Sequence, residues 1–225
     1  MGLTRRPLLL TAVRWLAVVL ILRVTAAILA NYPDYFPPNF ESLFLQGREA
    51  TFHGLYRAAF YVHVLTAPLV LVIGLFLVLD SGRRRGLHRA LGRVQVGVLL
   101  LVVLPSSAVM SRHAFGGWPA GLSFFTLSVV TAGCAVLGVV AARRKQYARH
   151  RRWMLRTFVL LCSAIVLRLI SGAAGEVGVP YPEQAYVAAA WASWVLPLAA
   201  TEVFLRRPAF LNSPAAPAAI RGGPS

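Results

Sequence analysis

Long apolar runs separated by short polar and basic segments dominate the chain. Six of them are long enough, or nearly so, to cross a hydrocarbon core of ~30 Å as helices of about 20 residues. The runs are Leu8–Ala30, Ala59–Leu79, Val94–Val109, Leu122–Ala142, Trp153–Ile170 and Ala185–Phe204. None alternates as a barrel strand does, and a backbone in lipid must satisfy its hydrogen bonds internally, so each run is predicted to be a helix.

Composition places the chain among integral membrane proteins. Of its 225 residues 58% are hydrophobic and 13% charged, whereas soluble domains carry about 25% charged residues. Two cysteines are too few for a disulfide scaffold. We therefore predict an all-α transmembrane domain of six helices over residues 1–207. The Pro-, Ala- and Gly-rich end, residues 208–225, is predicted to be a disordered cytoplasmic tail.

The net charge of +16 is concentrated at one side of the predicted bundle. Most Lys and Arg residues lie in the second and fourth connections, residues 83–93 and 143–156, and at the chain ends. Because short basic loops stay in the cytoplasm, both termini are predicted to be inside. A nucleic-acid partner is not expected, since no basic domain stands outside the membrane.

The basic connections have two interpretations. They set orientation alone, or they also bind anionic lipid headgroups. The residues expected to contact headgroups are Arg89, Arg93, Arg151 and Arg156. A homo-oligomer or a partner in a membrane complex is left open.

The first run also resembles an export signal, because Thr4-Arg5-Arg6 precedes it. Arg14 and Arg23 interrupt its apolar stretch, and the run is long enough to span. An uncleaved helix is favoured.

Residues 31–58 form an aromatic loop that is predicted to lie outside. Phe40, Leu43, Phe44 and Phe52 suggest a short amphipathic helix in the interface, beginning after Pro37-Pro38 with Asn39 as its cap. One interpretation is an aromatic belt at the membrane surface. The other is a lid over an outward-facing site.

Helices two to five contain an internal repeat. Arg83-Arg84-Arg85 is followed by His88-Arg89, and Arg143-Arg144-Lys145 is followed by His150-Arg151. Each unit would run from outside to inside and back, so the two units are predicted to form a four-helix core with helices one and six beside it. Selection for basic inner loops alone would also produce this likeness.

The histidines are candidate haem ligands. His63 and His113 are expected near the outer surface, and His88 and His150 near the inner surface. Two bis-imidazole haem b groups, one in each leaflet, would carry electrons across the bilayer. No other metal site is expected, because acidic residues are scarce in the apolar runs. The alternative is that these histidines contact headgroups and helix ends.

Ionisable groups inside a membrane are functional candidates. Arg23 and Arg168 both lie in the outer half and are predicted to bind an anionic substrate, or else to pair with Glu176 or Glu183. Arg14 and Glu202 share the inner half and suggest an ion pair between helices one and six.

Four short motifs together resemble a widespread bacterial family of polytopic membrane proteins whose shared domain has no known function. They are Phe60-Tyr61-Val62-His63, His88-Arg89-Ala90-Leu91-Gly92-Arg93, His150-Arg151-Arg152-Trp153-Met154-Leu155-Arg156 and Val166-Leu167-Arg168-Leu169. The resemblance covers residues 59–207 and implies a multi-pass inner-membrane protein without an assigned activity. A looser resemblance to cytochrome b561 implies haem ligation by paired histidines, although that family holds its ligands within helices.

The function expected from these observations is that of a non-redox transporter, a lipid- or small-molecule-binding protein, or an accessory membrane subunit. The alternative is a haem-b electron-transfer protein. Enzyme activity is left open and, if present, would be that of a membrane oxidoreductase. No phosphate-binding loop, dinucleotide fingerprint or nucleophile elbow is found in the sequence.

Overall fold

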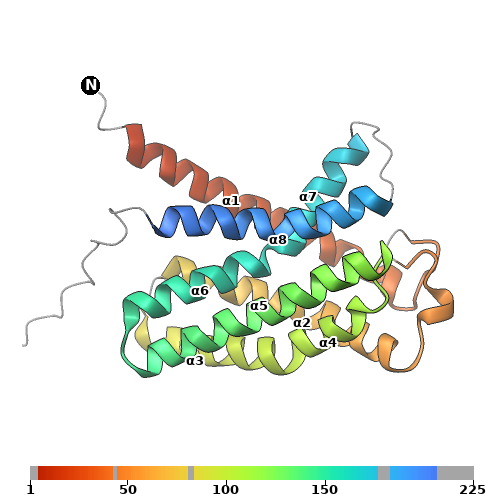
Figure 1. Ribbon diagram of the computed structural model, residues 1–225, viewed down its shortest axis with the longest axis horizontal. Helices are drawn as coiled ribbons and strands as arrows, with labels where there is room; N and C mark the ends of the chain where they lie inside the picture. The colour runs from red at the N-terminus through yellow and green to blue at the C-terminus, as the bar shows by residue number, and fades with distance from the viewer. Residues whose placement is uncertain (1–4, 43–44, 81–83, 177–182, 207–225) are drawn as a thin grey trace, which may run out of the picture.

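The computed structural model describes residues 5–42, 45–80, 84–176 and 183–206, and this part of the chain is helical and contains no strand (Figure 1). Six stretches are long and apolar enough to cross a membrane, which confirms the predicted all-α, six-span architecture. The spans are Thr11–Ala30, Gly54–Asp80, Arg85–Ser111, Gly117–Arg143, Tyr147–Ala174 and Glu183–Leu205. Several extend beyond the apolar runs, because basic and aromatic flanks continue the helices.

Four of the spans are continuous helices and two are interrupted. The continuous helices are α1 (Arg5–Ala30), α2 (Gly54–Asp80), α5 (Gly117–Arg143) and α8 (Glu183–Leu205). The third span consists of α3 (Arg85–Val98), the π-helical turn η3 (Leu99–Val103) and α4 (Leu104–Ser111). The fifth consists of α6 (Tyr147–Leu161) and α7 (Ser163–Glu176).

The interruption of the third span has a chemical cause. Pro105 has no N–H for the carbonyl one turn earlier, and its ring would clash with that carbonyl. The helix widens just before it, and the Leu104 N–H bonds to the Leu99 carbonyl five residues back. Such π-turns are frequent at functional sites in helices.

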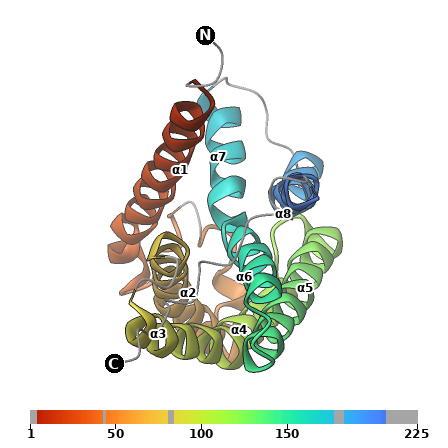
Figure 2. The ribbon, with the colours of Figure 1, turned by 90° about the vertical axis from the view of Figure 1, so that its left-hand side faces the viewer.

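The fifth span breaks at Cys162, whose N–H is shared between the carbonyls of Phe158 (3.1 Å) and Val159 (3.2 Å). A shared donor of this kind is common at helix ends. Beyond the break α7 diverges from α6, and Figures 1 and 2 show it leaving the lower bundle towards α1 and α8. The main contacts of α6 are with α5, whereas those of α7 are with α8 and α1.

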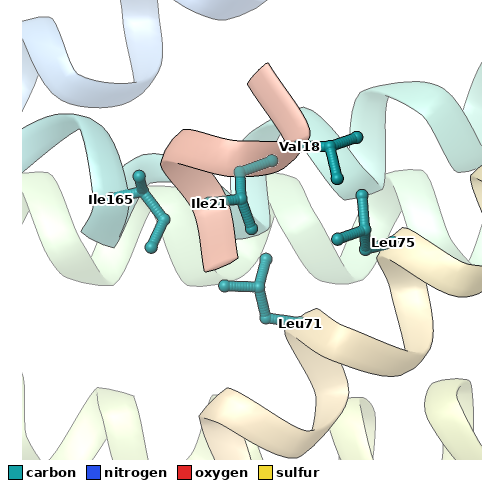
Figure 3. Packing of buried hydrophobic residues seen from close by; sticks show 5 residues of the cluster. All are labelled: Val18, Ile21, Leu71, Leu75 and Ile165. Atoms are coloured by element: carbon teal, nitrogen blue, oxygen red, sulfur yellow. The ribbon is translucent and has the colours of Figure 1, made fainter. Parts of the chain in front are cut away.

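The flanking helices complete the bundle around α2–α7. Helix α1 packs against α2 and α7 through an aliphatic cluster, in which side chains from all three helices converge (Figure 3). The cluster consists of Val18, Ile21, Leu71, Leu75 and Ile165. On the other side α8 contributes Trp194 to a core shared with Cys134 and Leu160.

The connections define two ends of the bundle. The ends of α2 and α5 and the beginnings of α3 and α6 gather at one end, here called the basic end (Figure 1). Residues 31–42 and 45–53 and the turn 112–116 lie at the opposite end, here called the aromatic end. This grouping agrees with the threading predicted from the charges. That the basic end faces the cytoplasm stays a prediction of the positive-inside rule.

The amphipathic helix predicted in the aromatic loop is wrong. The described residues from 39 to 48 form turns, flanked by the 3₁₀ turns η1 (Tyr32–Tyr35) and η2 (Glu49–Thr51). Asn39 caps only a local turn, in which its side-chain oxygen accepts the Glu41 N–H at 3.0 Å. Leu43 and Phe44, which belonged to the predicted face, lie outside the described residues.

The loop folds inward instead of lying along the surface. The rings of Tyr35 and Phe52 each meet Phe60 of α2 edge to face, with centroids 5.3 and 5.2 Å apart. Tyr35, Phe52 and Phe60 are buried. Edge-to-face packing of this kind adds to the hydrophobic gain of burial, so the rings are more stable against α2 than in an interfacial helix.

Candidate functional site

A cavity of about 280 Å³ lies in the half of the bundle nearer the aromatic end. This volume is close to the lower limit of ~300 Å³ for small-molecule pockets. Both interrupted spans contribute to its wall, and irregular backbone at membrane depth is tolerated where it lines a cavity. The polar side chains of the lining include His63, Arg168, Tyr35, Tyr186, Arg48, Ser128 and Thr131.

Arg168 of α7 lines this cavity, and the residue is exposed. Its guanidinium donates a hydrogen bond to the carbonyl of Ala164 on the same helix at 3.2 Å. Among the side chains that the structure describes, which do not include that of Glu176, no carboxylate lies within 4.0 Å of it. The described lining of the cavity also contains no Asp or Glu. A guanidinium in such surroundings creates a strong local preference for an anion.

The aromatic loop places Tyr35 beside this arginine. Burial raises the pKa of the Tyr35 phenol, and the nearby Arg168 guanidinium opposes the rise. The backbone carbonyl of Tyr35 accepts a hydrogen bond from the Tyr61 hydroxyl of α2 at 3.0 Å. The loop is thus fixed to α2 at the residue that faces the cavity.

A second tyrosine of the loop, Tyr32, is hydrogen-bonded to α2 beside Pro68. Pro68 cannot donate to the carbonyl of Val64, four residues earlier. The Tyr32 hydroxyl donates to that carbonyl. The loop therefore supplies the hydrogen bond that the proline removes, and this couples the position of the loop to α2 beside the cavity.

His63 has a defined tautomer at the π-turn. Its Nδ1 lies 3.3 Å from the Val103 carbonyl and 3.2 Å from the Ser106 hydroxyl oxygen. The Ser106 hydroxyl already donates its single proton to the Val103 carbonyl at 2.9 Å. Both neighbours of Nδ1 then act as acceptors, so we assign the hydrogen of the neutral ring to Nδ1, which leaves Nε2 as an acceptor in a residue that lines the cavity.

Arg48 holds the aromatic end together at the edge of the cavity. Its guanidinium donates to the Tyr56 hydroxyl at 2.9 Å and to the His113 carbonyl at 2.6 Å. The arginine thereby joins the loop to α2 and to the turn after α4. Its hydrogen bonds indicate a structural role.

At the basic end another arginine is fully paired. Arg156 of α6 contacts the Glu202 carboxylate through two nitrogens, at 2.5 and 2.9 Å, and its guanidinium stacks 4.5 Å from the Trp153 ring centre. The predicted pair between Arg14 and Glu202 is therefore wrong, because Glu202 faces α6. Arg156, a predicted headgroup contact, is engaged within the bundle.

The remaining arginines of the predicted sites are exposed. Arg23 on α1 is not among the cavity-lining residues, whereas Thr25 is. Thr25 lies two positions further along α1, and its side chain is turned by roughly 200° about the helix axis from that of Arg23. The structure therefore brings Arg168 but not Arg23 to the cavity. Arg89, Arg93 and Arg151 are exposed near the basic end, and their binding of headgroups stays a prediction.

The outer pair of predicted haem ligands, His63 and His113, lies in different surroundings, and haem ligation by this pair stays a prediction. The His113 ring packs edge-on against Tyr56, with centroids 5.0 Å apart. His63 is seven residues further along α2 than Tyr56, which is about 10 Å along the helix axis. Two imidazoles that share an iron must stand on either side of it, and these two lie at different depths.

The inner histidines are each held against a neighbouring element. His88 Nδ1 lies 4.0 Å from a carboxylate oxygen of Asp80 and has no hydrogen-bond partner. His150 Nδ1 lies 2.9 Å from the carbonyl of Gly138 on α5. Haem binding by these two residues stays a prediction, which an absorption spectrum after dithionite reduction would test. No cluster of three or more metal-binding side chains occurs among the described residues.

These features define a polytopic α-helical membrane protein with an interrupted-helix cavity. A family model matches residues 60–205, and the chain belongs to that family, the predicted membrane proteins DUF2306. No curated protein and no solved structure matches the chain. Membership of an uncharacterised membrane-protein family is confirmed, whereas the individual motifs and the likeness to cytochrome b561 stay predictions.

Proposed function

We propose that the protein binds a small organic monoanion in the cavity around Arg168, as a transporter or a membrane binding protein. The observation that supports this most strongly is a cavity-lining guanidinium that has no carboxylate partner in the described part of the chain. A planar guanidinium matches carboxylate and phosphate groups, because it offers two parallel donors.

The rest of the lining suggests an amphiphilic ligand. Most of its surface is apolar, with Ile28, Leu71, Phe124 and Leu160 among the lining residues. An anionic group at Arg168 and a short hydrocarbon body would satisfy both parts of the wall. Arg48 also lines the cavity but is hydrogen-bonded to the Tyr56 hydroxyl and the His113 carbonyl, so the proposed ligand carries one anionic group, at Arg168. The small volume favours a short chain.

The fold is compatible with transport. Interrupted helices around a central site, and two helical hairpins of similar design, are features of secondary transporters. At the basic end the Arg156–Glu202 pair joins α6 to α8. If the positive-inside rule holds, the cavity lies in the outer half and would receive its ligand from outside the cytoplasm.

Calorimetric titration of the purified protein in detergent micelles tests the proposal. The probes are hexanoate and hexyl phosphate, with uncharged hexanol as the matched neutral ligand. Hexanoate or hexyl phosphate should bind and hexanol should not. Which of the two anions binds more tightly then separates a carboxylate ligand from a phosphate ligand.

Arg168→Gln should weaken binding of the preferred anion about tenfold or more, the loss expected from one charge-assisted hydrogen-bonding group. Arg23→Gln is the matched control, because Arg23 is also an arginine of the outer half but does not line the cavity. Equal affinity in wild type and Arg168→Gln would overturn the proposal, and so would the absence of binding by either anion.

A further inference from the structure

Five of the serine and threonine hydroxyls that line the cavity share one hydrogen-bonding pattern. Each donates to a backbone carbonyl of its own helix, at 2.7 to 2.9 Å, and the Ser128 hydroxyl also lies 3.2 Å from the Ser107 hydroxyl oxygen. The residues are Thr25, Ser111, Ser128, Thr131 and Ser193. A hydroxyl whose only proton is used in this way retains lone pairs that can accept hydrogen bonds.

The same chemistry is already in use beside the cavity. The Trp194 indole N–H donates to the Ser123 hydroxyl oxygen at 3.0 Å, in a buried contact between α8 and α5. His63 adds another acceptor to the lining, because its Nδ1 carries the hydrogen and Nε2 does not. Apart from its arginines, Arg48 and Arg168, and its tyrosines, Tyr35, Tyr56 and Tyr186, the polar wall therefore presents mainly acceptors.

Four of these acceptors, His63, Ser128, Thr131 and Ser193, lie deeper in the bundle than Arg168, whereas Thr25 and Ser111 lie nearer the ends of their spans. Arg168 is six residues from Ala174, the last residue of its span, which is about 9 Å along the axis. On the same scale His63 lies about 14 Å from the start of α2, and Thr131 about 21 Å from the start of α5. A ligand held by its anionic group at Arg168 would extend its chain towards these acceptors.

We infer that the ligand is a short hydroxylated acid, with an anionic group at Arg168 and a hydroxyl donor at the far end of its chain. This inference rests on the proposed function and adds the donor to it. A buried acceptor without a donor loses hydrogen bonds it had with water, so a ligand that supplies the donor is preferred. An ammonium donor is disfavoured, because the described lining holds no carboxylate to balance its charge.

Titration of wild-type protein with three ligands of equal chain length tests the inference. The ligands are hexanoate, ω-hydroxyhexanoate and ω-aminohexanoate. We expect ω-hydroxyhexanoate to bind about fivefold more tightly than hexanoate, the effect of one net hydrogen bond. The amino acid should bind most weakly. Hexanoate binding as tightly as ω-hydroxyhexanoate, or tighter binding of the amino acid, would overturn the inference while leaving the anion site intact.

A pair of variants identifies the acceptors. Ser128→Ala combined with Thr131→Val removes two hydroxyls from the lining and should abolish the preference for ω-hydroxyhexanoate while hexanoate still binds. Thr157→Val is the control: Thr157 is buried on α6 and donates to its own helix at 3.0 Å, but it does not line the cavity. If the combined variant still prefers ω-hydroxyhexanoate to hexanoate, the ligand hydroxyl does not donate to these residues and the inference fails. If the wild-type protein binds none of these anions, the proposed function itself is refuted.

Discussion

Two arginines, twelve residues apart in the fifth span, are used in opposite ways. At the basic end Arg156 meets the Glu202 carboxylate through two nitrogens and packs on Trp153. Beyond the break at Cys162, Arg168 faces a cavity whose described lining has no carboxylate. A paired charge stabilises the contact between two helices, whereas an unpaired one is a cost to folding that a ligand can offset. The break divides a structural half of the span from a binding half.

The first prediction tests how closely α4 and α5 pack beside the cavity that Arg168 faces. A Cβ on Gly121 of α5 would lie 2.4 Å from the Ser111 carbonyl oxygen of the third span, so the two backbones would have to separate. Gly121→Ala should lower the free energy of unfolding by about 3 kcal/mol, the upper end for overpacking. Denaturation by SDS in mixed micelles would measure this.

Gly133→Ala is the control on the same helix, because nothing lies within 4 Å of the added Cβ. It should be neutral or stabilising by up to about 1 kcal/mol, since alanine is the better helix former. Equal destabilisation by the two substitutions would mean that α4 and α5 are not in close contact at Gly121.

Glu202→Gln removes the carboxylate from the Arg156–Glu202 ion pair. Removing one partner of a fully buried pair costs ~3–5 kcal/mol. The Glu202 side chain is 34% exposed, so we expect about 2 kcal/mol, reduced by solvent screening. Glu183→Gln, at the exposed start of the same helix, should be near neutral. A Glu202→Gln protein as stable as wild type would show that the pair does not hold α6 to α8.

The junction between the aromatic loop and α2 makes a smaller contribution. Tyr32→Phe leaves the Val64 carbonyl beside Pro68 without its hydroxyl donor. The loss should be about 1 kcal/mol, the typical contribution of one hydrogen bond. Tyr147→Phe, at an exposed position, should change nothing. A stable Tyr32→Phe protein with an unchanged protease-cleavage rate in the loop would contradict the assigned junction.

Alkaline titration tests the same loop with the smallest expected effect. Burial raises the pKa of both Tyr32 and Tyr35 above the ordinary value of 10.0. Because the folded state favours the neutral phenols, stability is retained below pH 10 and falls as the pH rises through the higher folded-state pKa values. Melting temperatures between pH 8 and pH 11 should show a fall that is smaller in Tyr32→Phe and Tyr35→Phe.

Hydropathy predicted the six spans because each apolar run has, or nearly has, the length of about 20 residues that a membrane-spanning helix needs. The breaks in the third and fifth spans were not predicted. Pro105 was a usable signal for the first of them, whereas no proline marks the second, at Cys162. The Arg156–Glu202 pair depends on which helices become neighbours, and charge positions alone favoured Arg14. The aromatic loop was misjudged because its spacing fits an amphipathic helix, while burial against Phe60 is a tertiary effect.

The candidate site is only partly predictable from the sequence. Arg23 and Arg168 were both predicted to bind an anion; the structure places Arg168 but not Arg23 in the cavity wall, and anion binding stays a prediction. Tyr35 and Tyr186 were missed as lining residues, because nothing in their local sequence says that they face α7. The serine and threonine acceptors were missed for the same reason.

The central claim, that Arg168 is an unpaired cation kept for a ligand, is tested most directly by melting temperatures without ligand. Arg156→Gln and Arg168→Gln make the same chemical change in one span and can be compared in the same detergent. We predict that Arg156→Gln lowers the melting temperature, whereas Arg168→Gln leaves it unchanged or raises it. A fall at Arg168→Gln as large as that at Arg156→Gln would show that Arg168 already has its partner within the protein.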